Sequence, residues 1–146
     1  MNRADKNKKR KEPPPYTSVR TTVPTERMVA CCKRVVHYLK TEKRYTQPSY
    51  SLWELAHETG MTAKLISTSI NGYMEQNFFE LVNRMRVEEA KSLLQKNSKS
   101  ERKVSLEEIG LQSGFNSRGA FFSRFKEYEG ITPRKYMLLN EEENKK

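Results

Sequence analysis

The sequence predicts an all-α fold, in which two helix-turn-helix subdomains are joined by one long linker helix, about seven helices in all. Beyond residue 25, apolar residues recur at steps of three and four, which is the period of an amphipathic helix. Capping residues and glycine stops divide this pattern into short helices. The order of these signals over residues 51–73 is repeated over 105–128 with low sequence identity. The chain therefore reads as one compact unit, made of two similar parts, with a tail.

The composition is strongly basic. Lysine and arginine number 28 against 18 acidic residues, which gives a formal charge of +10 and a pI near 9.7. A surplus of this size indicates a polyanionic partner or an anionic membrane surface. No apolar run of about 18 residues is present, and the N-terminus lacks the apolar core of a secretory signal. Cys31 and Cys32 are adjacent and cannot form an ordinary disulfide with each other, which fits a reducing cytoplasm.

Residues 1–24 read as a basic, proline-rich tail that we expect to be disordered. The basic run 6–11 is followed by three prolines at 13–15, and too few apolar residues are present to bury a core. Two interpretations are open at this point. The tail is either a solvated segment without a partner or an arm that adds non-specific affinity for phosphates.

The N-terminal helix and the first helix-turn-helix are predicted over residues 25–76. Thr25 can cap a helix that runs to about Lys43. Ser51, with Glu54 three residues later, has the pattern of a capping box at the start of the next helix. The predicted buried faces are Met28, Val29, Cys32, Val35, Val36 and Leu39 on the first helix and Leu52, Leu55 and Ala56 on the second, with Trp53 partly buried beside them.

Gly60 ends that helix and Thr62 caps the next, so that two short helices and a glycine-containing turn form a helix-turn-helix. Asn77 can cap the linker helix, predicted over residues 77–96 and about five turns long. Residues 97–103 are polar and read as a loop. The predicted buried positions are Leu65, Ile66, Ile70 and Tyr73 before the linker helix and Phe78, Leu81, Val82, Met85, Ala90, Leu93 and Leu94 within it.

The second helix-turn-helix is predicted over residues 97–140, followed by a charged tail over 141–146. Ser105 with Glu108 repeats the capping-box pattern, and Gly114 ends the helix that it opens. The aromatic residues of this part can in principle stack on unpaired bases, but their helical spacing favours core packing. The remaining signals are the N-cap Ser117, the apolar stripe Phe121, Phe125 and Tyr128, the stop at Gly130, the helix start at Thr132 and Pro133, and the further aromatics Phe115 and Tyr136.

A family resemblance rests on this C-terminal stretch and extends upstream to about Leu52, more loosely to about Glu26. The residues Gly114, Phe115, Ser117, Phe121, Phe125, Lys126, Gly130, Thr132, Pro133 and Tyr136 resemble the signature of the AraC/XylS family of bacterial transcription regulators. The resemblance implies two helix-turn-helix modules that read successive major-groove segments of double-stranded DNA, and an activator that engages RNA polymerase. Where the family commonly has alanine, this chain has Gly110, which costs its helix about 1 kcal/mol in propensity.

The resemblance also bears on location and control. The expected location is cytoplasmic and nucleoid-associated. Some members of the family carry a membrane-embedded sensor upstream, so a third interpretation of residues 1–24 is a juxtamembrane segment, with the chain as the cytoplasmic part of a membrane-anchored regulator. No small-molecule site is evident in the sequence, and a sensor domain upstream in a longer natural protein is one source of control.

The family positions that reach base edges fall on the second helix of each module. They are Lys64, Ser67 and Thr68 in the first module and Arg118, Gly119, Phe122 and Ser123 in the second. Lysine and arginine can donate to guanine, serine and threonine can bond several bases, and a phenylalanine can press on a thymine methyl group. Arg118 is the strongest candidate, near the start of its helix. Without the resemblance, an exposed polar face is the simpler interpretation.

Contacts to phosphate are expected around these helices, where they position the protein without reading sequence. Ser123 stands where the family commonly has arginine, and Arg124 follows one residue later, turned by roughly 100° around the helix. We therefore expect Arg124 to reach a phosphate. The full predicted set is Ser51, Asn71, Ser105, Arg124, Lys126, Arg134 and Lys135.

Two other function classes were weighed. A non-specific nucleic-acid-binding module that uses the basic tail is the alternative, and it predicts a steep salt dependence without sequence preference. An enzyme is not expected, because the sequence shows no nucleophile–base pair and no phosphate loop. Cys31 and His37 do not complete a zinc-ligand spacing, and His57 lies in a separate helical pattern, so neither a metal nor a cofactor is predicted.

Overall fold

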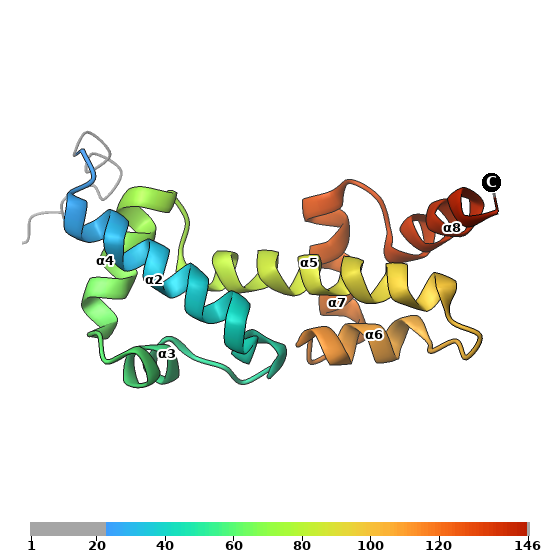
Figure 1. Cartoon of the computed structure of the whole chain (residues 1–146), viewed down its shortest axis with the longest axis horizontal. Helices are drawn as coiled ribbons and strands as arrows, with labels where there is room; N and C mark the ends of the chain where they lie inside the picture. Colours follow the sequence, from blue (N-terminus) through green and yellow to red (C-terminus); the bar gives the residue numbers. More distant parts are fainter. Residues whose placement is uncertain (1–22, 146) are drawn as a thin grey trace, which may run out of the picture.

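The computed structural model describes residues 23–145, and the predicted tail over 1–24 lies almost wholly outside them. The described chain contains seven α-helices and one short 3₁₀ helix, so the all-α prediction is confirmed (Figure 1). The elements are α2 (Glu26–Glu42), η2 (Arg44–Thr46), α3 (Leu52–Thr59), α4 (Ala63–Met74), α5 (Phe78–Lys99), α6 (Leu106–Ser113), α7 (Arg118–Glu129) and α8 (Pro133–Asn144).

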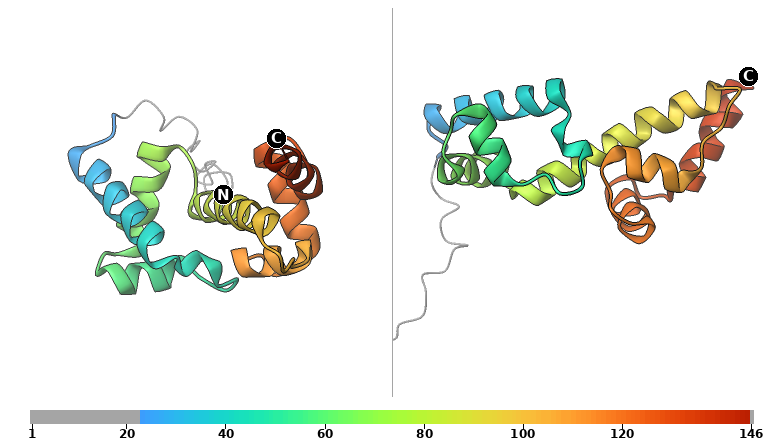
Figure 2. Two further views of the ribbon diagram at one scale, coloured as in Figure 1. Left: turned by 45° about the vertical axis from the view of Figure 1, so that its right-hand side comes forward. Right: turned by 90° about the horizontal axis from the view of Figure 1, so that it is seen from below.

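The long helix α5 is the axis of the molecule, with α2, α3 and α4 around its first half and α6, α7 and α8 around its second half (Figures 1 and 2). It contributes to two separate apolar cores, and the change from one to the other falls between Met85 and Val87. We call α2–α4 with the first half of α5 the first module, and the second half of α5 with α6–α8 the second module. Each module therefore consists of a helix-turn-helix completed by half of the linker helix.

In the first module, α4 packs closely against α2. Gly72 of α4 lies on this side, because an added Cβ there would collide with the Met28 side chain, and the small residue Ser69 one turn earlier is fully buried. Leu39, Leu55, Ile66 and Ile70 are 0% exposed in the core that the three helices share with α5. Both cysteines are free and buried, and burial together with the neighbouring Cys31 raises the pKa of Cys32 to about 11.

The second module is built on a run of aromatic rings. Phe121 lies 5.5 Å from Phe115 and 5.8 Å from Phe125, and Phe125 lies 5.5 Å from Tyr136, measured between ring centroids. Tilted and edge-on contacts of this kind stabilise a core beyond the area that they bury. These rings therefore pack in the second core, as their helical spacing predicts. A Cβ at Gly110 would lie 2.7 Å from Cδ2 of Phe121, so glycine lets this ring approach α6.

The helix boundaries follow the capping signals. Thr25, Ser51, Thr62, Asn77, Ser105, Ser117 and Thr132 each accept a hydrogen bond from a backbone N–H in the first turn of the helix that follows. Gly60, Gly114 and Gly130 end their helices in the left-handed conformation. The capping box at Ser51 is complete, but at Ser105 it is only half formed, because the Glu108 carboxylate accepts from Gln112 instead.

Several details of the prediction were wrong. Trp53, predicted to be partly buried, is 76% exposed, and Tyr73, predicted on the inward face of its helix, is 44% exposed. Helix α5 continues to Lys99, because the buried amide of Asn97 exchanges two hydrogen bonds with the backbone of Val104 and holds the helix end in place. Helix α8 runs to Asn144 and so includes most of the predicted charged tail.

Candidate nucleic-acid interface

Helices α4 and α7 are equivalent in register. Each begins after a capping hydroxyl, at Thr62 and Ser117, and the fourth residue after that cap is fully buried in both, as Ile66 and as Phe121. The next turn is also equivalent, with Ile70 and Phe125 at 0% exposure. Most of the predicted base-contacting residues lie on the sides of α4 and α7 that these anchors leave exposed, but Ser67 and Phe122 are half-buried, and Phe122 packs against the second core.

The candidate positions on α4 are one lysine and two short hydroxyl residues. Lys64 and Thr68 are exposed, and Ser67 is half-buried. The Asn71 amide donates to the Ser67 carbonyl oxygen at 2.9 Å. That bond keeps Asn71, a predicted phosphate contact, folded back on its own helix in the free protein.

On α7, Arg118 is held by two neighbours. Its Nη1 pairs with Oε1 of Glu107 on α6 at 3.0 Å, with 60% of the Arg118 side chain still exposed. Its guanidinium also lies 4.9 Å from the ring centroid of Phe122, which stacks edge-on against buried Phe121. Gly119 and Ser123 are exposed beside it. A surface ion pair is weak by itself, so the Glu107 contact orients Arg118 rather than locking it.

Glu107 was not identified from the sequence. It lies eleven residues before Arg118 and in a different helix, and its position in the first turn of α6 reads as an ordinary favourable interaction with the helix dipole. The pairing depends on how α6 and α7 are folded against each other. Matching the sequence residue by residue to a helix-turn-helix structure could have identified Glu107 as a neighbour of Arg118.

The predicted phosphate contacts fall into two groups. Lys126, Arg134 and Lys135 are exposed near the end of α7 and the start of α8. Arg124 is also exposed, but its Nη1 pairs with Oε2 of Glu127 at 3.0 Å on the same helix. The hydroxyl groups of Ser51 and Ser105 already accept from the backbone, so they cap their helices in the free protein.

A cleft of about 370 Å³ brings part of the predicted set together. It lies at the starts of α6, α7 and α8 and contains Ser105, Arg118 and Arg134 in its lining, with Lys103 and Glu107. The Lys103 Nζ donates to the Asn97 and Ser98 carbonyl oxygens at 2.9 Å each, so this lysine caps the C-terminal end of α5. The cleft thus combines two arginines and three helix starts, which favour an anion, with the carboxylates of Glu107 and Glu141, which oppose one.

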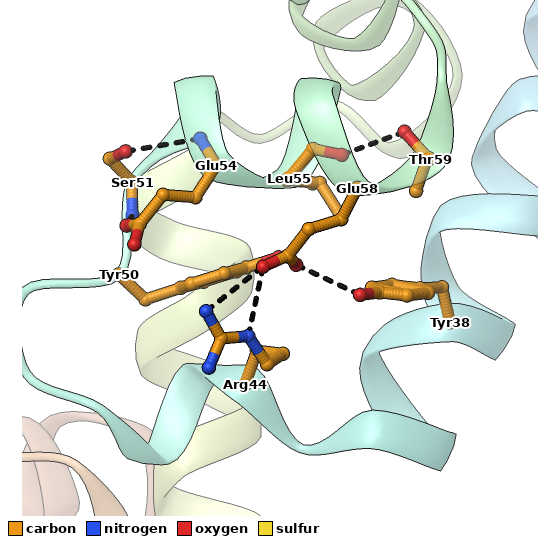
Figure 3. Close-up of polar contacts among 8 residues, drawn as sticks. All are labelled: Tyr38, Arg44, Tyr50, Ser51, Glu54, Leu55, Glu58 and Thr59. Carbon is orange, nitrogen blue, oxygen red and sulfur yellow. Dashed lines mark hydrogen bonds and ion pairs between the residues drawn. The ribbon is translucent and has the colours of Figure 1, made fainter.

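The last turn of α3 in the first module is held by a polar cluster around Glu58 (Figure 3). Tyr50 and Tyr38 donate to its Oε1 at 2.8 and 2.9 Å, and Arg44 donates to Oε2 at 3.0 Å. Burial alone would raise the pKa of Glu58, but these hydrogen bonds outweigh it and lower the pKa below its ordinary value. The same burial and bonding raise the pKa of Tyr50. The cluster ties α3 to α2 and to the segment around η2.

The two modules present their turns to the same edge of the molecule. Helices α3 and α6 both lie along the lower edge in Figure 1, and α4 and α7 both begin there and run upward. The turned view in Figure 2 shows α3 and α6 again at the lower edge. Lys64 lies in the first turn of α4 and Arg118 begins α7, and because both are exposed, neither is directed into the core.

Within residues 23–145, no helix is both long and apolar enough to cross a bilayer, and no group of three or more histidine, cysteine or acidic side chains is placed to hold a metal ion.

Comparison with known proteins places the chain among helix-turn-helix proteins. A family model described as a helix-turn-helix domain matches residues 55–138, which is more than half of the chain. No curated protein matches this chain.

Solved structures share the fold. A transcriptional regulator from Chromobacterium violaceum, described as containing an AraC-type DNA-binding domain, is 20% identical with a TM-score of 0.63, over 76% of this chain and 92% of that one. A DNA-binding transcriptional dual regulator from Escherichia coli K-12 is 20% identical with a TM-score of 0.61, over 73% and 88%. The C-terminal domain of the two-component response regulator yesN from Fusobacterium nucleatum is 24% identical with a TM-score of 0.59, over 74% and 98%.

Proposed function

This chain belongs to the AraC-type helix-turn-helix family of DNA-binding transcription regulators, and we propose that it binds duplex DNA sequence-specifically by reading two successive major-groove segments with α4 and α7. The observation that carries the proposal is the equivalence of the two helices. Both start from the same kind of cap, bury the same two positions and expose a basic residue in the first turn. Successive segments on one DNA face lie about 34 Å apart.

The proposed base contacts follow from exposure and chemistry. Arg118 reads guanine, because its forked guanidinium is exposed and already aligned by Glu107 and Phe122. On α4, Lys64, Ser67 and Thr68 read the other segment with shorter and less selective donors. Gly119 lets the duplex approach α7 closely, since a Cβ there would meet no atom within 4 Å in the free protein. Ser123 and the Phe122 edge complete that surface.

Phosphate contacts hold the protein in register in this proposal. Lys126, Arg134 and Lys135 supply charge beside α7, and Arg124 joins them by releasing Glu127. The N–H groups at the start of α3 and α6, after Ser51 and Ser105, supply backbone contacts of the kind that helix starts give to phosphate.

Selection of bound duplexes from a random pool tests the proposal. A single motif of roughly 15–20 bp with two conserved segments is expected, because the two helices contact the duplex about one helical turn apart. Equal affinity for random duplexes and single strands would instead favour the non-specific alternative, in which residues 1–24 supply most of the binding.

The role of Arg118 is tested on the selected site. Arg118→Ala is expected to cost about 1–3 kcal/mol at one base position and to relax the choice of base there. Arg124→Ala is the matched control, since it removes the same charge from the same helix and should weaken all sequences alike. Uniform weakening by Arg118→Ala would show that Arg118 contacts phosphate only.

We further propose that the bound protein activates transcription by engaging RNA polymerase, with control exerted by its abundance or by a sensor domain joined upstream. Transcription in a purified bacterial system, from a promoter carrying the selected site, tests the activating role. Increased transcript in the presence of the protein supports activation, and decreased transcript identifies a repressor.

A further inference from the structure

The two modules meet at the short segment 43–48, which contains η2. In Figure 1 this teal segment lies between α3 and the end of α6 that is nearest the middle of the molecule. It packs against both α5 and α6. Tyr45 is only 5% exposed there, and burial, with the charge of Glu89 as a smaller cause, raises its pKa to about 12. We call the segment 43–48, together with Arg86, Glu89 and Gly114, the junction.

Arg86 of α5 holds the junction from one side. Its Nε donates to the Tyr45 carbonyl oxygen at 2.7 Å, and its Nη2 donates to the Gln47 carbonyl oxygen at 3.0 Å. Burial lowers the pKa of Arg86, and the backbone dipoles of 43–48 replace the water that it loses. Lys43 adds an ion pair to Glu89 of α5 at 3.1 Å. One half-buried arginine therefore binds a segment of the first module at the point where α5 passes into the second.

Gly114 allows a close approach of α6 on the other side of the junction. It adopts a left-handed conformation with φ of 109° at the end of α6. A Cβ at this position would lie 2.8 Å from Nε of Arg86 and 2.9 Å from Cα of Thr46, and it would collide with the Tyr45 carbonyl oxygen. Glycine thus lets α6 approach closer to the first module than any other residue could. Ser117, the N-cap of α7, follows only three residues later.

The junction is connected to the elements that precede α4 and α7 in the chain. On the first side, Arg44 of η2 bonds Glu58 of α3, and the Thr59 carbonyl at the end of α3 accepts from Arg34 of α2 at 2.8 Å. On the second side, Gly114 stands at the start of the turn that leads into α7. The apolar cores do not make this connection, because they change over within α5 and share no buried residue.

We infer that Arg86 and Gly114 are positioning residues, which fix the relative rotation of α4 and α7 and thereby the spacing of the two DNA segments. Helix α5 alone fixes how far apart the modules are, but each module is attached to it by packing on one side. The junction is what stops one module from turning against the other. The part of this inference that concerns the spacing of the two DNA segments rests on the proposed function. The geometry of the junction itself does not depend on DNA.

The first test varies the DNA. The selected site is prepared with its two segments at the natural spacing and with 1, 2 or 3 bp inserted between them, and Kd is measured for each. One inserted pair turns the second segment by about 35° and moves it by about 3.4 Å. We expect wild type to lose at least tenfold in affinity per insertion, and Arg86→Met to lose less than threefold. Duplexes with a single segment should bind both proteins equally.

Lys91→Met is the matched control. It removes the same charge from α5, but Lys91 pairs with Glu88 and Glu129, inside the second module. It should keep the wild-type spacing profile. A steep profile in folded Arg86→Met would overturn the inference while leaving sequence-specific binding intact. Equal affinity of wild type for the selected site and for random duplexes would instead overturn the proposed function.

The second test needs no DNA. Spin labels are attached at Lys40 in α2 and Leu139 in α8, in a background in which Cys31 and Cys32 are replaced by alanine, and the distribution of distances between them is measured. A narrow distribution in wild type that broadens in Arg86→Met supports the inference. An equally narrow one overturns it. Arg86→Lys, which keeps the charge but loses the forked donor, is judged by the same two readouts if the methionine variant does not fold.

Discussion

The two helix-turn-helix units have the same register but fill their interiors differently. Where the first module has Ala56 on its first helix and Ile66 on its second, the second module has Gly110 and Phe121. A smaller residue on one helix thus accompanies a larger one on the other. The side-chain hydroxyls one turn later are equivalent too, since Thr59 and Ser113 each donate to the carbonyl four residues earlier at 2.7 Å. The comparison shows that register is kept while volume is redistributed.

The outer surfaces differ more than the cores do. At the position where the second module has Glu107 paired with Arg118, the first module has exposed Trp53, and Ala63 stands in the place of the arginine. The second module therefore offers an oriented arginine, whereas the first offers Lys64 together with short polar groups. The stabilising contacts show the opposite contrast. The first module carries the polar cluster around Glu58, and the second relies on stacked aromatic rings. The next four predictions test these contrasts, from the largest expected effect to the smallest.

The aromatic core should be the more sensitive of the two. Phe121→Ala is expected to lower the free energy of unfolding by about 3–5 kcal/mol, since a large buried ring is replaced by a cavity. Ile66→Ala at the equivalent position should cost less, about 2–4 kcal/mol, because fewer buried groups are removed. Denaturant titration followed by circular dichroism measures both. A larger loss for the isoleucine variant would contradict the view that the ring run stabilises the second module.

The polar cluster should make the first module sensitive to acid. Glu58→Gln is expected to cost about 1–3 kcal/mol at neutral pH, because the tyrosine hydroxyls and Arg44 lose a charged acceptor. Since the folded pKa of Glu58 lies below its ordinary value of 4.5, its contribution is complete above that pH and is lost as the pH falls through the lower folded value. Unfolding measured from pH 7 to pH 3 should show wild type approaching the variant at the acid end. A constant difference across this range would contradict the assignment.

Alanine at Gly110 should not stabilise the second module. Helix propensity alone favours Gly110→Ala by about 1 kcal/mol, but the added Cβ meets Phe121, and overpacking costs about 1–3 kcal/mol. We expect no net gain in the free energy of unfolding. Combining it with Phe121→Leu, which frees space, should cost less than the two separate changes added together. A full gain of about 1 kcal/mol for Gly110→Ala alone would show that the ring moves aside freely.

Phosphate contacts should be unequal between the modules. Lys135→Ala is expected to reduce the slope of log K against log salt concentration by about 1, with equal weakening on all sequences. Asn71→Ala should leave the slope unchanged, because its amide is uncharged and bonded to Ser67. Titrations of both variants at several salt concentrations decide this point. An equal change in slope for both variants would contradict the prediction that the two modules make unequal phosphate contacts.

The regular elements could be predicted from the sequence because their signals are local. Caps such as Ser117 and stops such as Gly130 act within one turn, and the buried stripe of α7 follows from its period. The exposure of Trp53 could not be predicted in this way. Periodicity places it beside Leu52, but whether that side is covered depends on which other helix packs there.

The site was predicted as a set of positions but not as an arrangement. Matching to the family pattern gave Arg118, yet its partner Glu107 is brought to it only by the fold of α6 on α7. Arg86 was also missed, because an arginine on a long helix reads as a solvated charge. Its burial against three carbonyl groups, those of Tyr45, Gln47 and Pro48, arises from a segment some forty residues away in the chain.

One consequence of the shared helix α5 concerns dissection of the protein. The 22 residues of this helix complete both cores, so a cut on either side of it removes the cover from half of its apolar side chains. A fragment ending at residue 99 would expose Val87, Ala90 and Leu94 to water, and one beginning at residue 77 would expose Phe78, Leu81 and Val82. Either piece would tend to self-associate through that bare stripe. The two halves are thus similar in design but not separable as independent folding units.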